Sequence, residues 1–284
     1  MRALVIVGVL LVGSLAHADA KADVEALVNA NLEAIAKNNQ KAFNATLRKD
    51  AYQFLPSTDA PSLVERFHGY HTYDAKHTIE KITVVADTAT KTAWFHVQFT
   101  ATYNVAMMNP DGPIPRQSDT LRMAGIALDD GGWKIAAVMY GHAILDKTLY
   151  ERTDPDAKAP AKPTLKGDKA SAGVVAKWFA KGGAIAGDQS AGTIAVNGTA
   201  AGEYGTGSVA TTMVKAWDKL KLWPIAAMGK RWGAFPIAMV KAEVGLPVKA
   251  GGATKMRLAA ILVKDGETWR WASLAFFAWF DESN

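Results

Sequence analysis

The chain has 284 residues, of which 49% are hydrophobic and 21% are charged, and its formal net charge at pH 7 is +5. This composition excludes a disordered chain, and the length suits one large domain or two of ordinary size. So mild a charge does not indicate a nucleic-acid-binding protein, and we expect no nucleic-acid partner. The sequence has no cysteine, which excludes disulfides, thiolate nucleophiles and thiolate metal sites.

The first twenty residues, MRALVIVGVLLVGSLAHADA, have the pattern of a secretory signal peptide. Arg2 supplies the positive start, residues 3–15 form a short apolar core, and Ala18 and Ala20 each end a small-x-small cleavage site. The alternative is a membrane anchor, which needs about 20 apolar residues and is therefore longer than this core. We expect export to the periplasm or the medium, with no membrane insertion once residues 1–20 are removed.

Helices are predicted before strands in the first half of the mature chain. Helical spacing of apolar residues predicts a helix from Val24 to Ile35, which Asn38-Asn39 ends, and shorter helices at about 40–49 and 62–67. Runs rich in β-branched and aromatic residues predict strands at 79–85, 92–103, 121–128 and 133–141, with a hairpin turn at 129–132. Helices followed by a run of antiparallel strands indicate an α+β fold.

The second half repeats this order after a segment without a visible period. Residues 151–168 contain three prolines and many charges, which predicts a linker. A helix is then predicted over 172–181, and a second one with an apolar face formed by Val209, Met213, Trp217 and Leu220. The strands that follow are predicted around 225–228, 233–244, 256–264 and 269–279.

The ends of the two halves match best. RMAGIALDDGGWKIAAVMYGH begins at Arg122, and RLAAILVKDGETWRWASLAFF begins at Arg257. Each stretch has an arginine, an apolar strand, an acidic-glycine turn, a tryptophan and a final strand that is apolar on both faces. We interpret this match as a tandem duplication.

The last strand, WRWASLAFFAWF (269–280), needs cover on both of its faces. Strict alternation places Trp269, Trp271, Ala275, Phe277 and Trp279 on one face and Ala272, Leu274, Phe276, Ala278 and Phe280 on the other. Burying a large apolar side chain contributes about 1.5–3 kcal/mol, so exposing several would be costly and would favour aggregation. We expect helices on one face and the sheet of the other copy on the other, as an internal pseudo-dimer in a monomeric chain. The alternative is that each outer face binds another chain.

Two stretches resemble the SnoaL-like group of the nuclear-transport-factor-2-like superfamily. They are AIAKNNQKAFNATLRKDAYQFLPS (34–57) and the hairpin that begins at Arg122. The resemblance covers 22–148 well and 170–280 more weakly. It implies two tandem cone-shaped domains, 21–150 and 169–284, joined by the linker 151–168, each with N-terminal helices packed on a bent antiparallel sheet. The superfamily contains isomerases, cyclases, dehydratases and non-catalytic binding modules, so the resemblance implies a fold and not an activity.

A proton-transfer site, if present, is expected in the first half, because it holds every histidine that follows the signal peptide. The resemblance implies that His142, at the end of the closing strand, lines the cavity, and a neutral histidine can act as a base near pH 7. Tyr140, Tyr103 and Asp50 complete the catalytic candidates. Related ketosteroid isomerases use buried acids. Residues 92–103 and 121–127 contain no Asp or Glu, which argues against that chemistry.

The ligand-binding candidates are Arg122, a possible anchor for an anion, with Phe99 and Tyr52. HGYH (68–71) with His77 matches no standard zinc motif, so we expect no metal and no cofactor. In the strand 92–103, alternation assigns Phe95, Val97, Phe99 and Tyr103 to the helix-covered face and His96 to the face that meets the other domain.

We predict a non-catalytic module that binds a small apolar ligand or a protein partner. The alternative is an isomerase, cyclase or dehydratase type of enzyme that transfers a proton in the first domain.

Overall fold

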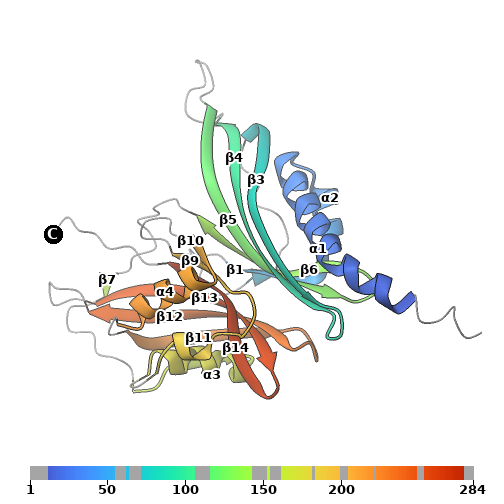
Figure 1. Cartoon of the computed structure of the whole chain (residues 1–284). Coiled ribbons are helices and arrows are strands. Elements are labelled where there is room, and N and C mark those ends of the chain that lie inside the picture. Colours follow the sequence, from blue (N-terminus) through green and yellow to red (C-terminus); the bar gives the residue numbers. More distant parts are fainter. Residues whose placement is uncertain are drawn as a thin grey trace, which may run out of the picture.

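The computed structural model of the protein describes residues 12–54, 62–63, 72–105, 116–142, 152–153, 161–180, 183–198, 204–219, 222–247 and 253–277. These residues form an α+β structure with two sheets, each of which carries helices on one side (Figure 1). We call the helix-covered side of each sheet its inner face and the opposite side its outer face. None of the described helices has the length and the apolar character that crossing a bilayer requires.

The first sheet has six strands in the order β2-β1-β6-β5-β4-β3. Strands β3 to β6 are antiparallel neighbours, as the sequence predicted, whereas β1 joins β6 in parallel. The elements are α1 (Val12–Ala36), α2 (Gln40–Thr46), β1 (Leu47–Phe54), β2 (Ser62–Leu63), β3 (Thr72–Asp87), β4 (Thr92–Val105), β5 (Arg116–Asp129) and β6 (Trp133–His142).

The turn between the first two helices confirms the predicted stop. Asn38 has a positive φ of 52°, and the Asn39 side chain accepts a hydrogen bond from the Ala42 amide at 3.0 Å, which caps α2. The predicted helix at 40–49 is wrong beyond Thr46, because the chain there turns into β1 and pairs with β6. The predicted helix at 62–67 is also wrong at its start, since Ser62–Leu63 is a strand paired with β1. Residues 64–67 lie outside the described ones.

The second sheet repeats this strand order. It runs β10-β9-β14-β13-β12-β11-β8, and β9 lies parallel to the closing strand just as β1 does in the first sheet. The elements are β7 (Arg152–Thr153), β8 (Thr164–Gly167), α3 (Lys169–Trp178), η2 (Ala186–Asp188), β9 (Ala195–Gly198), β10 (Tyr204–Thr206), α4 (Ser208–Trp217), β11 (Trp223–Arg231), β12 (Ile237–Pro247), β13 (Ala253–Asp265) and β14 (Thr268–Phe277). Within the stretch expected as a linker, β7 pairs with β13 and β8 pairs with β11.

Both closing strands carry a β-bulge at the same place in the repeat. The register shifts opposite Ile126 in the first sheet and opposite Ile261 in the second, which leaves Ala136 and Ala272 as the extra residues. Each alanine lies three positions after a tryptophan near the start of its strand, Trp133 in β6 and Trp269 in β14. Because the shared bulge is an irregular feature, it supports the duplication independently of the matched sequence.

The bulge also changes which side chains of β14 face which way. Trp269, Trp271 and Leu274 join the buried cluster on the inner face, whereas Ala272 and Ala275 join the cluster on the outer face. The strict alternation expected from the sequence is therefore wrong, because one extra residue reverses the facing of all residues after it.

Helices cover the inner face of each sheet. In the first half, Val24, Val28 and Leu32 of α1 pack on the inner face of β3 to β6. In the second half, α3 and α4 cover a core that contains the fully buried Trp271, whose indole nitrogen donates to the Ile185 carbonyl at 2.7 Å. The predicted inward face of α4 is wrong at Val209, which is 54% exposed, because Ala210 and Val214 are its buried residues.

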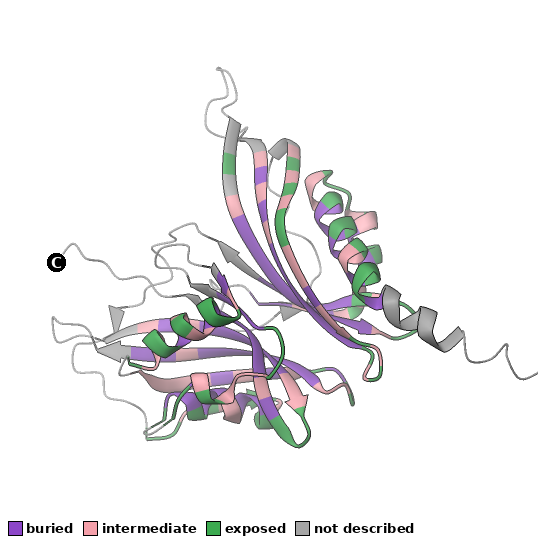
Figure 2. Cartoon of the chain, in the orientation of Figure 1, coloured by how far each residue is buried: buried purple, intermediate pink, exposed green. Residues whose placement is uncertain are grey.

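The two outer faces pack against each other within the chain. This inter-sheet cluster takes its largest side chains from both sheets, and Figure 2 shows buried residues running through the strands of both. The members are Phe54, Trp94, Ala124, Ile126, Leu128, Ala136, Ala137 and Met139 of the first sheet and Ala195, Trp232, Ile237, Met239, Ala259, Ile261, Ala272 and Ala275 of the second half. Both faces of the closing strands are thus covered over their described side chains, as their composition predicted, whereas residues 278–280 lie outside the described ones.

Two polar contacts mark the same boundary. The Trp232 indole nitrogen donates to the Asp50 carbonyl at 3.2 Å, and the Lys230 ammonium lies 4.5 Å from the centre of the Tyr52 ring. A cation placed over an aromatic face is attracted by the ring electrons. Both contacts join β1 of the first half to the end of β11 in the second.

Replacing Ile261 with Ala should lower the free energy of unfolding by about 2–5 kcal/mol, because a fully buried side chain leaves a cavity between the sheets. Urea denaturation measures this change. The control is Val209→Ala at an exposed site, which should stay within about 0.5 kcal/mol of the wild type. Equal effects of the two substitutions would contradict the inter-sheet packing.

Candidate functional site

The inner face of the first sheet is built from alternate residues of β4. Phe95, Val97 and Phe99 are buried there beneath α1, which confirms that this face is the helix-covered one. Strands β3, β5 and β6 add further aliphatic side chains, among them Met123 and Ile135. The result is a nearly pure hydrocarbon surface.

His77 introduces a polar group into this surface. It lies on β3, where it is half-buried, and its ring centre is 5.0 Å from that of Phe99 at a tilt of 52°. Its Nδ1 is 2.9 Å from the carbonyl oxygen of Leu32 in α1. Because that oxygen only accepts, Nδ1 carries the hydrogen, and Nε2 is the acceptor nitrogen of the ring.

Burial lowers the pKa of His77, and the hydrogen bond to the Leu32 carbonyl offsets this only in part. His77 is therefore neutral at pH 7, and its Nε2 is buried within an apolar surface. Near this core, the amide nitrogen of the buried Asn31 donates to the hydroxyl of the buried Thr46 at 2.8 Å and so ties α1 to α2. The buried charged side chains among the described residues, Arg122 and Lys241, lie outside this core.

His96 lies on the opposite, outer face, as the sequence predicted. It alternates with Trp94, a member of the inter-sheet cluster, and it is 1% exposed. Burial, reinforced by the positive charges of Arg122 and Lys81, lowers the pKa of His96 to about 3. Lys81 itself reaches the second half, since its ammonium donates to the Thr206 hydroxyl at 3.4 Å.

A chain of hydrogen bonds continues along this outer face beyond His96. The Arg122 Nε donates to the Gln98 side-chain oxygen at 3.3 Å, and the Gln98 amide nitrogen donates to Glu80 at 2.5 Å. The Thr100 hydroxyl also donates to Glu80. These bonds, first that from Gln98 and then that from Thr100, lower the pKa of Glu80. Its carboxylate thus ends a network that starts at Arg122.

The second sheet holds related residues at the matching positions. Arg257 pairs across the strands with Glu243, at 3.8 Å between Nε and Oε1, where Arg122 pairs with Gln98 in the first sheet. The position that matches His96 is occupied by Lys241, which is 5% exposed. The duplication has therefore kept a basic residue at this buried position in both sheets.

The structure places the predicted ligand-binding residues at three different locations. Phe99 lies on the inner face beside His77, Arg122 belongs to the outer-face network, and Tyr52 lies under Lys230 at the boundary with the second half. These three side chains do not converge on one site. The Asp50 side chain is 48% exposed and forms an ion pair with Arg48 at 2.8 Å.

The remaining catalytic candidates are placed by their backbone only. His142 pairs with Leu121, Tyr140 with Met123, and Tyr103 with Gln117, all within the first sheet. Their side chains lie outside the described ones, as do residues 68–71 of the HGYH stretch, and their roles stay predictions. Within the described part of the chain, no group of three His, Asp or Glu residues is placed to hold a metal ion.

Sequence reasoning missed His77 as a residue of the inner face. It was grouped with His68 and His71 by their close spacing, while the strand was expected to begin only at residue 79. On β3, His77 lies two residues before Ile79, which pairs with Phe99. Extending the predicted strand by two residues would therefore have identified His77 as a residue of the inner face.

No protein-family model matches the sequence, and no curated protein is similar to it. Solved structures that resemble parts of the chain belong to the nuclear-transport-factor-2-like superfamily, as the sequence suggested. One such protein from Salmonella enterica serovar Typhimurium strain LT2 is 15% identical over 43% of this chain and 89% of its own, with a TM-score of 0.36.

Two further structures show a similar level of likeness. The hexachlorocyclohexane dehydrochlorinase LinA-type3 from Novosphingobium barchaimii LL02 is 12% identical over 45% of this chain and 90% of its own, with a TM-score of 0.39. A nuclear-transport-factor-2-like protein with a cystatin-like fold from Novosphingobium aromaticivorans is 11% identical over 48% of this chain and 89% of its own, with a TM-score of 0.38. Such likeness concerns the fold of about half of the chain.

The buried His96 predicts a loss of stability in acid. The unfolded chain binds a proton near pH 6.5 and the folded chain only near pH 3, so the unfolded state holds more protons between these values. The free energy of unfolding should therefore fall as the pH decreases through this window, by about 1.4 kcal/mol per unit of pKa difference. Urea denaturation at pH 7, 5.5 and 4 measures it.

The matched variant is His96→Gln, which keeps a polar side chain but cannot titrate. Its free energy of unfolding should depend on pH distinctly less than that of the wild type over the same window. An identical pH dependence in both proteins would show that His96 titrates normally when folded.

Proposed function

We propose that the protein is a non-catalytic binding module that takes a small apolar molecule on the inner face of its first sheet. The observation that carries this proposal is His77, a neutral histidine within a hydrocarbon surface that has no charged side chain among its described residues. A neutral histidine among aromatic and aliphatic groups suits a ligand with a large apolar body and a single hydroxyl or amine.

Binding is favoured over catalysis because the described inner face offers only one half of a proton-transfer site. Isomerases and dehydratases need a base and also a group that stabilises the charge developing on the substrate. His77 can act as the base, but no acid or cation accompanies it on the described inner face. Asp50, the acid among the catalytic candidates, is paired with Arg48 instead.

The second candidate function is a proton-transfer enzyme of the isomerase, cyclase or dehydratase type. The lowered pKa of His77 favours it, because a neutral imidazole at pH 7 is ready to accept a proton. In this scheme His142, Tyr140 and Tyr103 supply the groups that the described inner face lacks.

Binding can be tested with 2-naphthol and naphthalene, followed by the fluorescence of the ligand. The variant His77→Leu should bind 2-naphthol about three- to tenfold more weakly, because it loses one hydrogen bond, and should bind naphthalene unchanged. Thr78→Ala is the matched control, since Thr78 is exposed on the same strand and pairs with the outer-face residue Thr100. Failure of the wild type to bind either probe would contradict the proposal.

Catalysis can be tested in the same variants by proton exchange. NMR in deuterated water follows the exchange of the protons next to the carbonyl of 2-tetralone. The proposal expects no acceleration by the wild type. Acceleration that is lost in His77→Leu or His142→Ala, and retained in Thr78→Ala, would instead establish the enzyme.

We also propose that the protein is exported as a monomer to the periplasm or the medium. The apolar core at 3–15 and the cleavage sites at Ala18 and Ala20 support export. The inter-sheet cluster supports a monomer, because the face through which a partner chain would bind is already covered.

Expression of the full chain in a bacterium tests export. N-terminal sequencing of the mature protein should begin at Asp19 or Lys21, and fractionation should find it outside the cytoplasm. Leu11→Arg, which places a charge in the apolar core of the signal, should leave the chain uncut in the cell. An uncut wild-type chain in the cytoplasm would refute the proposal.

A further inference from the structure

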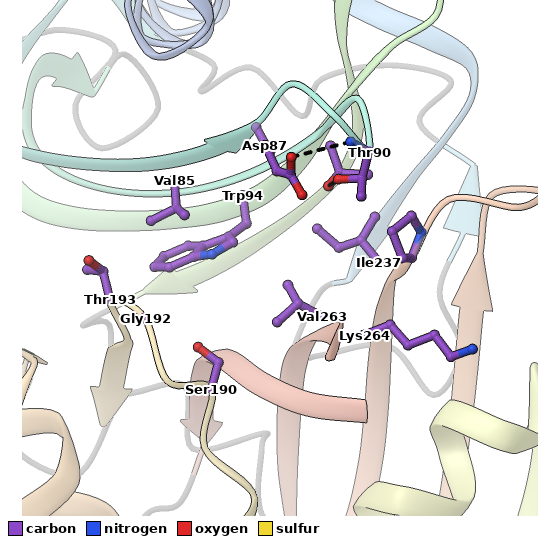
Figure 3. Close-up of a pocket in the computed structure, with 13 residues that line it drawn as sticks. Val85, Asp87, Thr90, Trp94, Ser190, Gly192, Thr193, Ile237, Val263 and Lys264 are labelled. Atoms are coloured by element: carbon purple, nitrogen blue, oxygen red, sulfur yellow. Dashed lines mark hydrogen bonds between the residues drawn. The ribbon is translucent and has the colours of Figure 1, made fainter. Parts of the chain in front are cut away.

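We propose that a second binding site lies between the two sheets and takes a neutral molecule with one aromatic ring and a hydroxyl group. The site is a cavity of about 210 Å³ at one edge of the inter-sheet contact. It is distinct from the inner face beside His77. Its walls come from the β3–β4 hairpin of the first sheet and from the β12 and β13 strands and the 190–193 segment of the second half (Figure 3).

The body of the cavity is apolar and held in place by packing. Trp94 and Val85 line it from the first sheet, and Ile237 and Val263 line it from the second. Trp94 and Ile237 are 3% and 1% exposed and belong to the inter-sheet cluster, so both are fixed before a ligand arrives. Figure 3 shows Trp94, Ile237 and Val263 directed toward one shared space. A ring bound there would contact the indole on one side and branched aliphatic groups on the other.

The polar lining consists mainly of hydroxyl groups. The hydroxyls of Thr90 and Thr92 are 2.8 Å apart, and one of the two donates to the other. Since each hydroxyl has one hydrogen and two lone pairs, this pair still has a hydrogen to donate and lone pairs that accept. Ser190 and Thr193 add two hydroxyls from the second half. Such groups suit a ligand hydroxyl, which both donates and accepts.

The two charged residues of the lining are engaged by their own neighbours. The Asp87 carboxylate accepts hydrogen bonds from the backbone amides of Ala89 and Thr90 at 2.9 and 3.3 Å, as Figure 3 shows for Thr90. The Lys264 ammonium pairs with Glu267 at 2.9 Å. Because the lining carries one negative and one positive residue, their charges balance, and the cavity favours a neutral molecule.

The volume of the cavity suits a ligand with a single ring. A buried apolar cavity of about 150 Å³ is enough to hold benzene, whereas drug-sized ligands occupy about 300–1,000 Å³. The space of about 210 Å³ therefore suits one ring with a small substituent.

Phenol and toluene are the probes for this site. NMR titration of the protein, with the tryptophan indole nitrogens labelled with ¹⁵N, should show phenol binding with a shift of the Trp94 signal, which Trp94→Phe identifies by its loss. Phenol should bind more tightly than toluene, which lacks the hydroxyl. Binding of phenol that leaves the Trp94 signal unshifted would place phenol elsewhere and overturn the proposal, as would no binding by the wild type.

Val263→Phe fills the cavity and should weaken phenol binding at least tenfold. The matched control is Val209→Phe, the same change at an exposed site, which should leave phenol affinity unchanged. Ser190→Ala combined with Thr193→Val removes two lining hydroxyls without adding volume, and should reduce the preference for phenol over toluene. If Val263→Phe fails to fold, adding Thr90→Val and Thr92→Val to this second variant removes all four lining hydroxyls, and an unchanged preference for phenol then refutes the hydroxyl-lined site.

Discussion

The contact between the outer faces of the two sheets is the interaction on which the rest of the structure depends. Strands β6 and β14 are apolar on both faces, and helices can cover only one face of each sheet. Because the other faces cover each other, the helices are free to enclose the inner faces, and the two sites proposed for ligands lie on an inner face and between the sheets. The same contact buries His96 and Lys241, which in an isolated sheet would meet water.

The long strands could be predicted from the sequence, because their alternation is local information. The helix stop at Asn38, the 129–132 turn and the need to cover both faces of β14 were accessible for the same reason. Strand β1 could not be predicted, since its parallel pairing with β6 joins segments far apart in the chain and overrides the local helix signal. The bulges at Ala136 and Ala272 were also hidden, because an alanine suits either face.

The candidate site was predictable only where alternation decided it. The outward placement of His96 followed from its position between Trp94 and Gln98. The pairing of β4 with β5 sets Arg122 opposite Gln98. Because Gln98 and Phe99 are consecutive in β4 and point to opposite faces, this register could also have shown that Arg122 does not share a face with Phe99. His142, Tyr140 and Tyr103 rest on the resemblance to a family, and the described side chains do not extend to them. His77 was missed because it was grouped with His68 and His71 as a candidate metal cluster and because the strand was expected to begin at residue 79.

The placement of both sheets in one polypeptide has a consequence for how the halves can diverge. Two identical subunits related by a twofold axis must present the same residue at both matching positions, whereas here histidine occupies one and lysine the other. The tether also supplies a high effective concentration of one half for the other, so that dilution does not separate them. Each half can therefore accumulate its own substitutions, with histidines gathered in one and most tryptophans in the other, while the assembly stays intact.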